Sequence, residues 1–359
     1  MKAALWYGRQ DVRVENIPEP EVGPGEVKVK VKWCGLCGSD VHEYHDGPIT
    51  IPVDKPHPVT GKKAPVVIGH EYSGEVVAVG EGVNGFKVGD RVSAETTIAC
   101  MECHACKAGE LTHCENLGIT GLSGYGGAFA EYCLVKEQFL HHLPDELDYA
   151  KAAIVEPFTV GFHAVDAGDF KAGMCAVVLG AGPIALGTIE VLKASGARRI
   201  ICVARKEKPK QFALAAGADI VVDPEKCDAA AEIKRLTGGI GADICFETFG
   251  SDIGPAIGQD CLRSHGTLVI ISLWNKPAQV DLMTTVQKEL RIVGTNLSSF
   301  NDYETVIKMF CDGRMSGDYY VTKCIHLDDL VEEGYGALLG PDRKEHVKIL
   351  VTPDKALLG

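Results

Sequence analysis

The chain has 359 residues, of which 46% are hydrophobic and 24% are charged, values ordinary for a globular protein long enough for two domains. A net charge of -13 argues against a nucleic-acid partner, because there is no excess of cations to neutralise phosphates. Residues 1–9 lack the apolar segment of a signal peptide, and the longest nearly uncharged run, 174–189, is too short to span a membrane. We therefore expect a cytoplasmic protein.

The first part of the chain, residues 1–157, contains short strand-like runs separated by glycine and proline. Residues 27–32 alternate valine with lysine, the pattern of a strand with one buried face, and 75–80 is a second strand candidate. These patterns predict a mostly β domain with long loops. We expect the last residues, 301–359, to rejoin this domain through a final strand at 346–351.

Four cysteines stand close together, at Cys100, Cys103, Cys106 and Cys114. Their spacing lets a folded loop offer four thiolates to one zinc ion, and such a closed set leaves no position open for a substrate. The sequence therefore predicts a structural zinc lobe, with a disulfide cluster as the alternative. Apart from these four and Cys37, the chain's cysteines are scattered singly, as is typical of reduced core residues.

From about residue 158, strand and helix patterns alternate, which is typical of a parallel sheet covered by helices on both faces. We therefore predict an α/β domain over residues 158–300. The expected strands are 176–179, 199–203, 219–222, 243–246 and 267–271, and the expected helices include 184–195 and 229–236.

A glycine-rich turn follows the first of these strands. The segment from Gly180 through Gly182, Pro183 and Ile184 to Ala185 fits the G-x-G-x-x-[G/A] pattern of dinucleotide-binding folds. The first glycine permits a tight turn, the second lets a pyrophosphate approach the backbone, and the helix N-terminus offers N–H groups to the phosphates. We predict that these residues bind a dinucleotide; the alternative is a glycine turn without a ligand.

The choice of cofactor depends on Ala204, at the end of the second strand of this domain. Folds that bind NAD usually place an acidic residue there to hold the adenosine ribose. Ala204 instead leaves room for a 2′-phosphate, and Arg205 and Lys206 supply cations to pair with it. The sequence therefore favours NADP(H) over NAD(H), unless Arg205 and Lys206 merely begin a solvated helix.

Three further motifs make the pattern specific. They are the segments 34–42 (CGLCGSDVH), 69–74 (GHEYSG) and 155–157 (VEP). The first two segments precede the cysteine lobe, and the third lies between the lobe and the glycine turn. With motifs in this order, the whole chain resembles the zinc-dependent medium-chain dehydrogenases. With residues 32–44, 51–58 and 272–277, the resemblance is strongest to the 2,3-butanediol (acetoin) dehydrogenases, near the sorbitol and threonine dehydrogenases. It implies a GroES-like catalytic domain beside a Rossmann domain.

The resemblance also implies a ligand set for a catalytic zinc. Cys37, His70 and Glu156 would bind the ion, with Glu156 where ethanol-type enzymes have a cysteine. Glu71 would lie beside the metal, as a direct ligand or in exchange with water and substrate. Asp40 would orient the His70 ring from behind.

The same resemblance implies a route for the proton. Zinc would lower the pKa of the alcohol, hydride would pass to the nicotinamide, and Ser39 would take the proton and pass it to His42 at the surface. The alternative for His42 is an ordinary surface histidine.

Together these expectations describe a homodimer or homotetramer with two zinc ions per chain that interconverts a small vicinal diol and its hydroxyketone. The 46–63 segment, of butanediol type, and the oxygen-rich ligand set favour 2,3-butanediol and acetoin. A polyol (sorbitol-type) or other secondary-alcohol dehydrogenase and a threonine-type enzyme are alternatives. A non-catalytic NADPH-binding protein is the alternative from another class.

Overall fold

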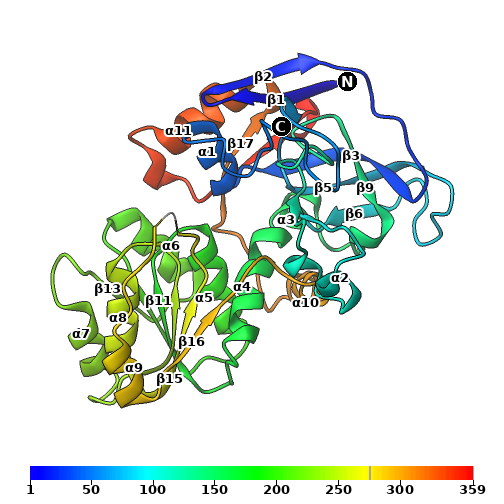
Figure 1. Cartoon of the computed structure of the whole chain (residues 1–359). Coiled ribbons are helices and arrows are strands. Elements are labelled where there is room, and N and C mark those ends of the chain that lie inside the picture. The colour runs from blue at the N-terminus through cyan, green and yellow to red at the C-terminus, as the bar shows by residue number, and fades with distance from the viewer. Residues whose placement is uncertain (275, 359) are drawn as a thin grey trace. The chain divides into compact units, whose positions relative to one another are not determined.

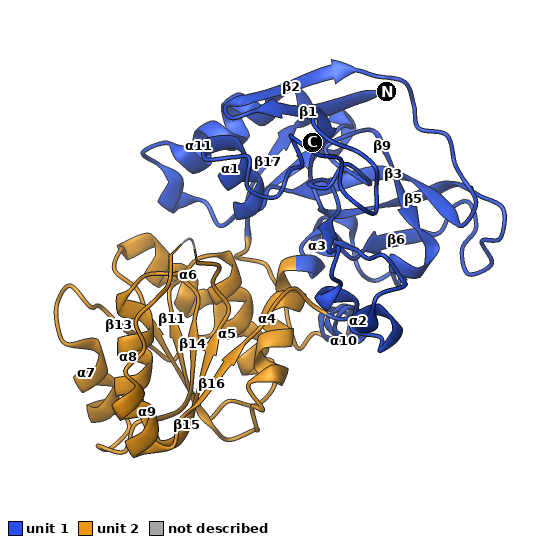
Figure 2. Ribbon diagram, in the orientation of Figure 1, with its two compact units in different colours: residues 1–156, 299–311, 321–359 blue, residues 157–298, 312–320 orange. Residues whose placement is uncertain are grey.

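The computed structural model describes residues 1–274 and 276–358; Asn275, in the 272–277 stretch noted above, lies outside the described residues. The chain divides into two compact units, coloured separately in Figure 2. Unit 1 comprises residues 1–156, 299–311 and 321–359, and unit 2 comprises 157–298 and 312–320. We had expected all of 301–359 to belong to the first domain, whereas residues 312–320 group with unit 2.

The segment 312–320 is held in unit 2 by a buried carboxylate. Oε1 of Glu190 accepts hydrogen bonds from the backbone N–H groups of Ser316, at 2.6 Å, and Gly317, at 3.1 Å. The Tyr319 hydroxyl donates to the Leu186 carbonyl oxygen at 3.1 Å. These polar contacts attach the segment to unit 2. They could not be predicted from the hydrophobic pattern of the segment.

Unit 2 is built on a six-stranded sheet in the order β13-β12-β11-β14-β15-β16, with all neighbours parallel. This is the doubly wound order of the Rossmann fold and confirms the predicted fold class. Helices cover both faces, α5 and α6 on one and α7, α8 and α9 on the other (Figure 1). The strands are β11 (Cys175–Leu179), β12 (Arg199–Val203), β13 (Ile220–Val222), β14 (Ala242–Glu247), β15 (Leu262–Ile270) and β16 (Arg291–Gly294). The helices are α4 (Val155–Ala167, which begins in unit 1), α5 (Pro183–Ala194), α6 (Glu207–Ala216), α7 (Ala229–Leu236), α8 (Ile253–Cys261) and α9 (Leu282–Lys288).

Unit 1 is mostly β, as the first part of the sequence predicted. Its main sheet has the order β10-β6-β5-β3-β18-β17, with β9 also paired to β3. The strands are β1 (Lys2–Gly8), β2 (Asp11–Asn16), β3 (Glu26–Gly35), β4 (Val66–Val67), β5 (Glu71–Val79), β6 (Arg91–Ala94), β7 (Thr97–Ile98), β8 (Gly118–Ile119), β9 (Tyr132–Lys136), β10 (Leu140–His142), β17 (Val321–His326) and β18 (Lys348–Thr352). The helices are α1 (Gly38–His45), α2 (His104–Lys107), α3 (Tyr149–Ala153), α10 (Phe300–Cys311) and α11 (Gly336–Leu339).

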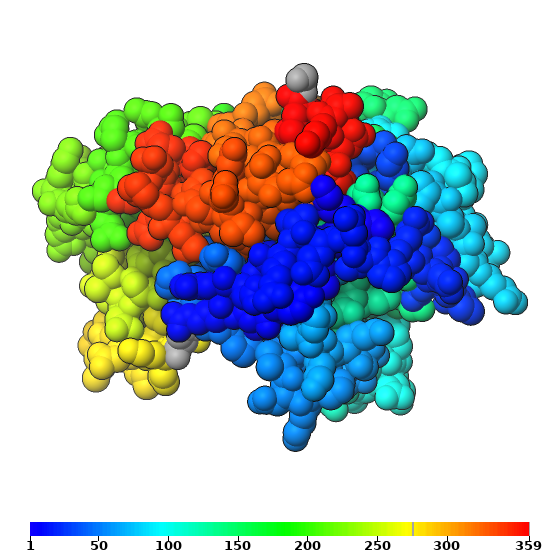
Figure 3. All heavy atoms as spheres, turned by 90° about the horizontal axis from the view of Figure 1, so that it is seen from above, coloured from blue at the N-terminus to red at the C-terminus, as the bar shows by residue number. Residues whose placement is uncertain are grey.

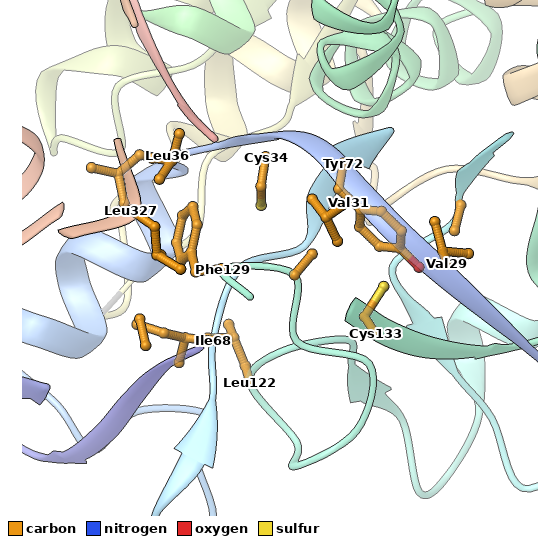
Figure 4. Packing of buried hydrophobic residues seen from close by; sticks show 14 of the residues in the cluster. Val29, Val31, Cys34, Leu36, Ile68, Tyr72, Leu122, Phe129, Cys133 and Leu327 are labelled. Atoms are coloured by element: carbon orange, nitrogen blue, oxygen red, sulfur yellow. The ribbon is translucent and has the colours of Figure 1, made fainter. Parts of the chain in front are cut away.

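Strand β3 carries the chain from the surface into the core of unit 1. Its valines are buried while its lysines are only partly so, as the alternating sequence predicted, and from Trp33 onward every residue of the strand is buried. Figure 4 shows Cys34 and Leu36 packed among the aromatic and aliphatic side chains of this core. The core therefore fixes the backbone immediately before Cys37.

The C-terminal residues return to unit 1 beside the N-terminus. Strand β18 lies between β3, its antiparallel neighbour, and β17, its parallel neighbour. Lys2 Nζ pairs with Asp328 Oδ1 at 2.7 Å. Figure 3 shows the blue N-terminal residues and the orange residues near the C-terminus side by side on the surface. Among the helices formed by residues 1–274 and 276–358, none combines the length and apolar character that crossing a bilayer requires.

Candidate functional site

A cluster of metal-ligating side chains, with Cys37 half-buried and His70 and Glu71 buried, forms where β3 ends and β5 begins. The antiparallel register pairs Gly35 with Glu71, so that Cys37, the N-cap of α1, lies near His70 and Glu71. One ligand atom from each of Cys37, His70 and Glu71 lies within 4.8 Å of the others. A Cβ atom on Gly35 would overlap Oε2 of Glu71, so glycine at this position leaves room for the carboxylate.

The His70 ring is oriented by a carboxylate behind it. Nδ1 of His70 lies 3.6 Å from Oδ1 of Asp40, and Oδ2 of Asp40 accepts the backbone N–H of Cys37 at 3.0 Å. Burial lowers the pKa of His70, but the charges of Asp40 and Cys37 outweigh it, so the pKa is well above its usual range. With Nδ1 turned towards Asp40, Nε2 is the atom available to a metal, as expected of an oriented histidine ligand.

Lys348, which the sequence reasoning missed, lies against Glu71. Its Nζ is 2.7 Å from Oε1 and 2.6 Å from Oε2 of Glu71, and it also donates to the Leu36 carbonyl at 3.3 Å. Burial lowers the pKa of Lys348, yet the negative charges of Glu71 and Cys37 raise it further, with a net increase. The available signal was a single lysine at the start of an otherwise apolar strand, because such a lysine is rarely buried without a partner.

Glu156 is buried near this cluster but is not part of the group that lies within 4.8 Å. It is the second residue of α4. Burial raises the pKa of Glu156 to about 7, and the negative charge of Glu71 acts in the same direction. Two neighbouring buried carboxylates repel each other unless a cation joins them, so this feature also fits a metal site.

Ser39 and His42 lie on α1, three residues apart and hence on one side of the helix. The Ser39 hydroxyl is 3.2 Å from Nε2 of His70, so it adjoins the cluster. The His42 side chain is 68% exposed, with Nδ1 3.6 Å from Oδ2 of Asp46. The structure thus places Ser39, which is half-buried, beside the cluster and His42 in solvent.

The four lobe cysteines also form a compact group. Each offers a sulfur within 4.8 Å of the others, with Cys100 and Cys106 3.9 Å apart and Cys103 and Cys114 4.0 Å apart. A zinc ion bound by four sulfurs at about 2.3 Å requires sulfur atoms separated by about 3.8 Å. Backbone N–H groups of Cys106 and Glu115 lower the pKa of Cys103 to about 6, which favours the thiolate. Among the described residues no cysteine forms a disulfide, so the disulfide alternative is wrong.

The glycine turn follows β11 as predicted. Gly180 has φ of +117°, a conformation that disfavours any side chain, and its N–H donates to the Val203 carbonyl at 3.0 Å. Gly182 is the N-cap of α5 and Pro183 its first residue, so the free N–H groups of the helix face the turn. Ala185 is fully buried, as the packing of helix on strand requires.

The residues expected to select the cofactor lie directly after β12. Ala204 is buried, whereas Arg205 and Lys206 are exposed. Nζ of Lys206 lies 3.5 Å from Oε1 of Glu225. Lys206 is also the N-cap of α6, so these exposed cations fit both a contact with a 2′-phosphate and the alternative of a solvated helix start.

Comparison with known proteins adds a family to this geometry. The alcohol dehydrogenase GroES-like domain model matches residues 23–145, and the zinc-binding dehydrogenase model matches 183–312. (R,R)-butanediol dehydrogenases of Bacillus subtilis and Neisseria gonorrhoeae are 48% and 40% identical, each over 99% of this chain and 100% of the relative. The crystal structure of 2R,3R-butanediol dehydrogenase from Bacillus subtilis has a TM-score of 0.93 at 47% identity, covering 98% of this chain and 99% of that one. Sorbitol dehydrogenases of two bacteria also match, at 33% and 32% identity. Similarity of this extent shows that the chain belongs to the zinc-binding, medium-chain alcohol dehydrogenase family, as its motifs predicted.

Proposed function

We propose that this protein interconverts 2,3-butanediol and acetoin, or a closely similar vicinal diol and hydroxyketone, with NADP(H) as the preferred cofactor. The observation that carries the proposal is the cluster of Cys37, His70 and Glu71, the last two buried, with Glu156 nearby. The names of the relatives, butanediol dehydrogenases at 48% and 40% identity, support the substrate class.

The residues of the cluster fit a zinc ion. Cys37, His70 and Glu156 would hold it, and Glu71 would bind it or exchange with substrate, so that three protein ligands leave one open position. Bound zinc would supply a Lewis acid that lowers the pKa of the substrate hydroxyl, and bound NADP(H) would supply the hydride acceptor or donor. The lobe cysteines would hold a second, structural zinc.

Residues of the protein can accept the proton of the substrate hydroxyl and transfer it to solvent. Ser39 adjoins Nε2 of His70, at 3.2 Å, and can accept a proton from a hydroxyl bound at the cluster. His42 stands exposed on the same helix and can exchange that proton with solvent near neutral pH. Asp40 is the positioning residue that holds the His70 ring.

The carboxylates of Glu71 and Glu156 support recognition of a second oxygen on the substrate. A site built for a vicinal hydroxyl discriminates against compounds that lack it, because its buried polar groups are then left unpaired. Steady-state kinetics with acetoin, 2,3-butanediol isomers, 2-butanone, 2-butanol, sorbitol and threonine, with both cofactors, tests this. We expect a higher kcat/KM for acetoin and 2,3-butanediol, and we expect Glu71→Ala to narrow the gap to the mono-functional compounds. Equal efficiency on 2-butanone and acetoin would make this a general secondary-alcohol dehydrogenase, and preference for sorbitol would favour the polyol alternative.

Metal content separates the enzyme from a non-catalytic NADPH-binding protein. Two zinc ions per chain support the enzyme, whereas one or none, without turnover of any compound in the panel, supports the binding protein. The absence of disulfides among the described cysteines supports a reducing, cytoplasmic setting.

A homodimer or homotetramer is supported by the surface around β16. Among the described residues, β16 has a strand neighbour on one side only, so its other edge carries unpaired backbone groups. Large apolar side chains are exposed in the same part of unit 2, at Leu273, Leu282, Met283, Val286 and Ile292. Size-exclusion chromatography with light scattering measures the oligomeric state of the protein. A monomer at micromolar concentration would contradict this proposal.

A further inference from the structure

A cavity of about 390 Å³ lies in unit 1 and shares no residue with the metal cluster or the lobe cysteines. Its wall comes from the segment that joins β6 to the lobe, from β9 and from the residues after it. Glu95, Thr97, Thr120, Val135 and Phe139 line it, and each is buried as a residue. The buried residues of the cavity are thus both polar and apolar.

Its polar wall has unused hydrogen-bonding capacity. Glu95 is only 5% exposed and contacts His141 Nε2 through Oε1 at 3.3 Å, which leaves Oε2 for the cavity. Thr97 and Thr120 are 3% and 4% exposed, and neither hydroxyl bonds to a described residue.

The charge on this wall is not balanced by the protein. The imidazole of His141 is shared between Glu95 and Glu304, whose Oε1 lies 2.8 Å from Nδ1. Burial raises the pKa of Glu95, and the negative charge of Asp302 adds to that increase, against the opposing effect of His141. One imidazole between two carboxylates leaves an excess of carboxylates.

The other carboxylate of the cavity is already satisfied. Oε1 of Glu26 lies 3.1 Å from Lys136 Nζ and accepts the Tyr125 hydroxyl at 3.1 Å. The negative charge of Glu95 would repel an anionic ligand. A neutral ligand would leave that charge uncompensated, so the cavity favours a cationic ligand. The apolar wall of Ile98, Val135 and Phe139 suits a short hydrocarbon body.

We propose that this cavity is a second ligand site, which binds a small primary ammonium ion with an aliphatic body. The ammonium group lies against the free oxygen of Glu95 and the Thr120 hydroxyl, which accept two of its three donors. The aliphatic body packs on Ile98, Val135 and Phe139. The site does not depend on the proposed reaction, because none of its residues belongs to the metal cluster.

The test uses n-butylammonium, with 1-butanol as the uncharged probe of the same length, on the zinc-loaded protein. Calorimetry gives the affinity, and crystals soaked in each probe show where it binds. We expect butylammonium in the cavity, with affinity at least about ten-fold above that of butanol, and an about ten-fold loss in Glu95→Gln. The matched control is Glu146→Gln, which removes an exposed carboxylate of the same unit that does not line the cavity and should change affinity less than about three-fold.

Four results would overturn the proposal. They are equal binding of butanol and butylammonium, unchanged affinity in Glu95→Gln, butylammonium found only at the metal cluster, and no saturable binding at all. If Glu95→Gln does not fold, Thr120→Val keeps the volume of the wall and removes one acceptor. It should weaken butylammonium by about three-fold or more, and no change in a folded Thr120→Val protein would count against the site.

Discussion

Lys348 Nζ contacts both carboxylate oxygens of Glu71, at 2.7 and 2.6 Å, although the two residues are 277 positions apart in the sequence. Both side chains are buried, so each charge depends on the other for compensation. Glu71 belongs to the metal cluster, and Lys348 can therefore hold its charge whenever the carboxylate is not bound to a metal. The ion pair with Lys348 lowers the free-energy cost of releasing Glu71 from a metal ion, because the carboxylate keeps a cationic partner.

Replacing Lys348 with Met should leave Glu71 as an unpaired buried carboxylate. We expect the free energy of unfolding of the zinc-free protein to fall by about 3–5 kcal/mol, measured by urea denaturation. The zinc-loaded protein should lose less, because the ion replaces the missing charge. Lys323→Met is the control, since its pair with Glu333, at 2.9 Å, is partly exposed and such pairs contribute about 0–1 kcal/mol. Equal losses in the two variants would contradict a special role for Lys348.

Ser39→Ala removes the hydroxyl beside Nε2 of His70. We expect kcat to fall by about 10²–10⁴ while affinity for NADP(H) is largely kept, since general acid–base groups contribute rate enhancements of that size. His42→Ala should have a smaller effect, because water can replace an exposed relay. His45→Ala, at the end of the same helix, is the control and should leave kcat unchanged. Full activity in Ser39→Ala would rule out the proton path.

Ala204→Asp places a carboxylate where the 2′-phosphate is expected. In this variant the ratio of kcat/KM for NADP to that for NAD should fall. Arg205→Ala should lower the affinity for NADPH, but not for NADH, by about ten-fold or more, because a charge-assisted contact is lost. Arg198→Ala removes an exposed cation just before β12, at the opposite end of the strand, and serves as the control. Equal use of NADH and NADPH by the unmodified protein would contradict our interpretation of Ala204, Arg205 and Lys206.

Cys103→Ser removes one thiolate from the lobe. We expect atomic absorption to show one zinc ion fewer per chain, together with a lower Tm, because a bound metal contributes directly to the stability of such a loop-rich segment. Cys227→Ser, at an exposed free cysteine of unit 2, should change neither quantity. An unchanged zinc content in Cys103→Ser would show that the lobe binds no metal.

The sequence predicted best what depends on local pattern. The expected strands 176–179 and 199–203 agree with β11 and β12 to within one residue, because buried parallel strands are continuous apolar runs. The helix expected at 229–236 is α7 itself. Cys37, His70 and Glu71 come together because their motifs occupy the ends of paired strands, which motif spacing alone does not reveal.

What the sequence did not predict depends on contacts between distant residues. The buried ion pair of Lys348 with Glu71, and the hold of Glu190 on Ser316 and Gly317, join segments more than a hundred residues apart. A single lysine or glutamate carries no periodic signal, so its partner appears only in three dimensions. Glu156, which the resemblance places among the zinc ligands, is buried beside the cluster but outside the group within 4.8 Å, and its role as a ligand stays a prediction.

The return of residues 312–320 to unit 2 has a consequence for how this protein can be taken apart or recombined. The chain passes between the units after residues 156, 298, 311 and 320, so neither unit is one uninterrupted stretch of polypeptide. No single cut releases a whole unit, and a gene fragment ending at residue 298 would lack the nine residues, 312–320, that Glu190 holds. Exchange of the nucleotide-binding part between relatives therefore requires two coordinated replacements, and a chimera made with only the longer one should be less stable than either parent.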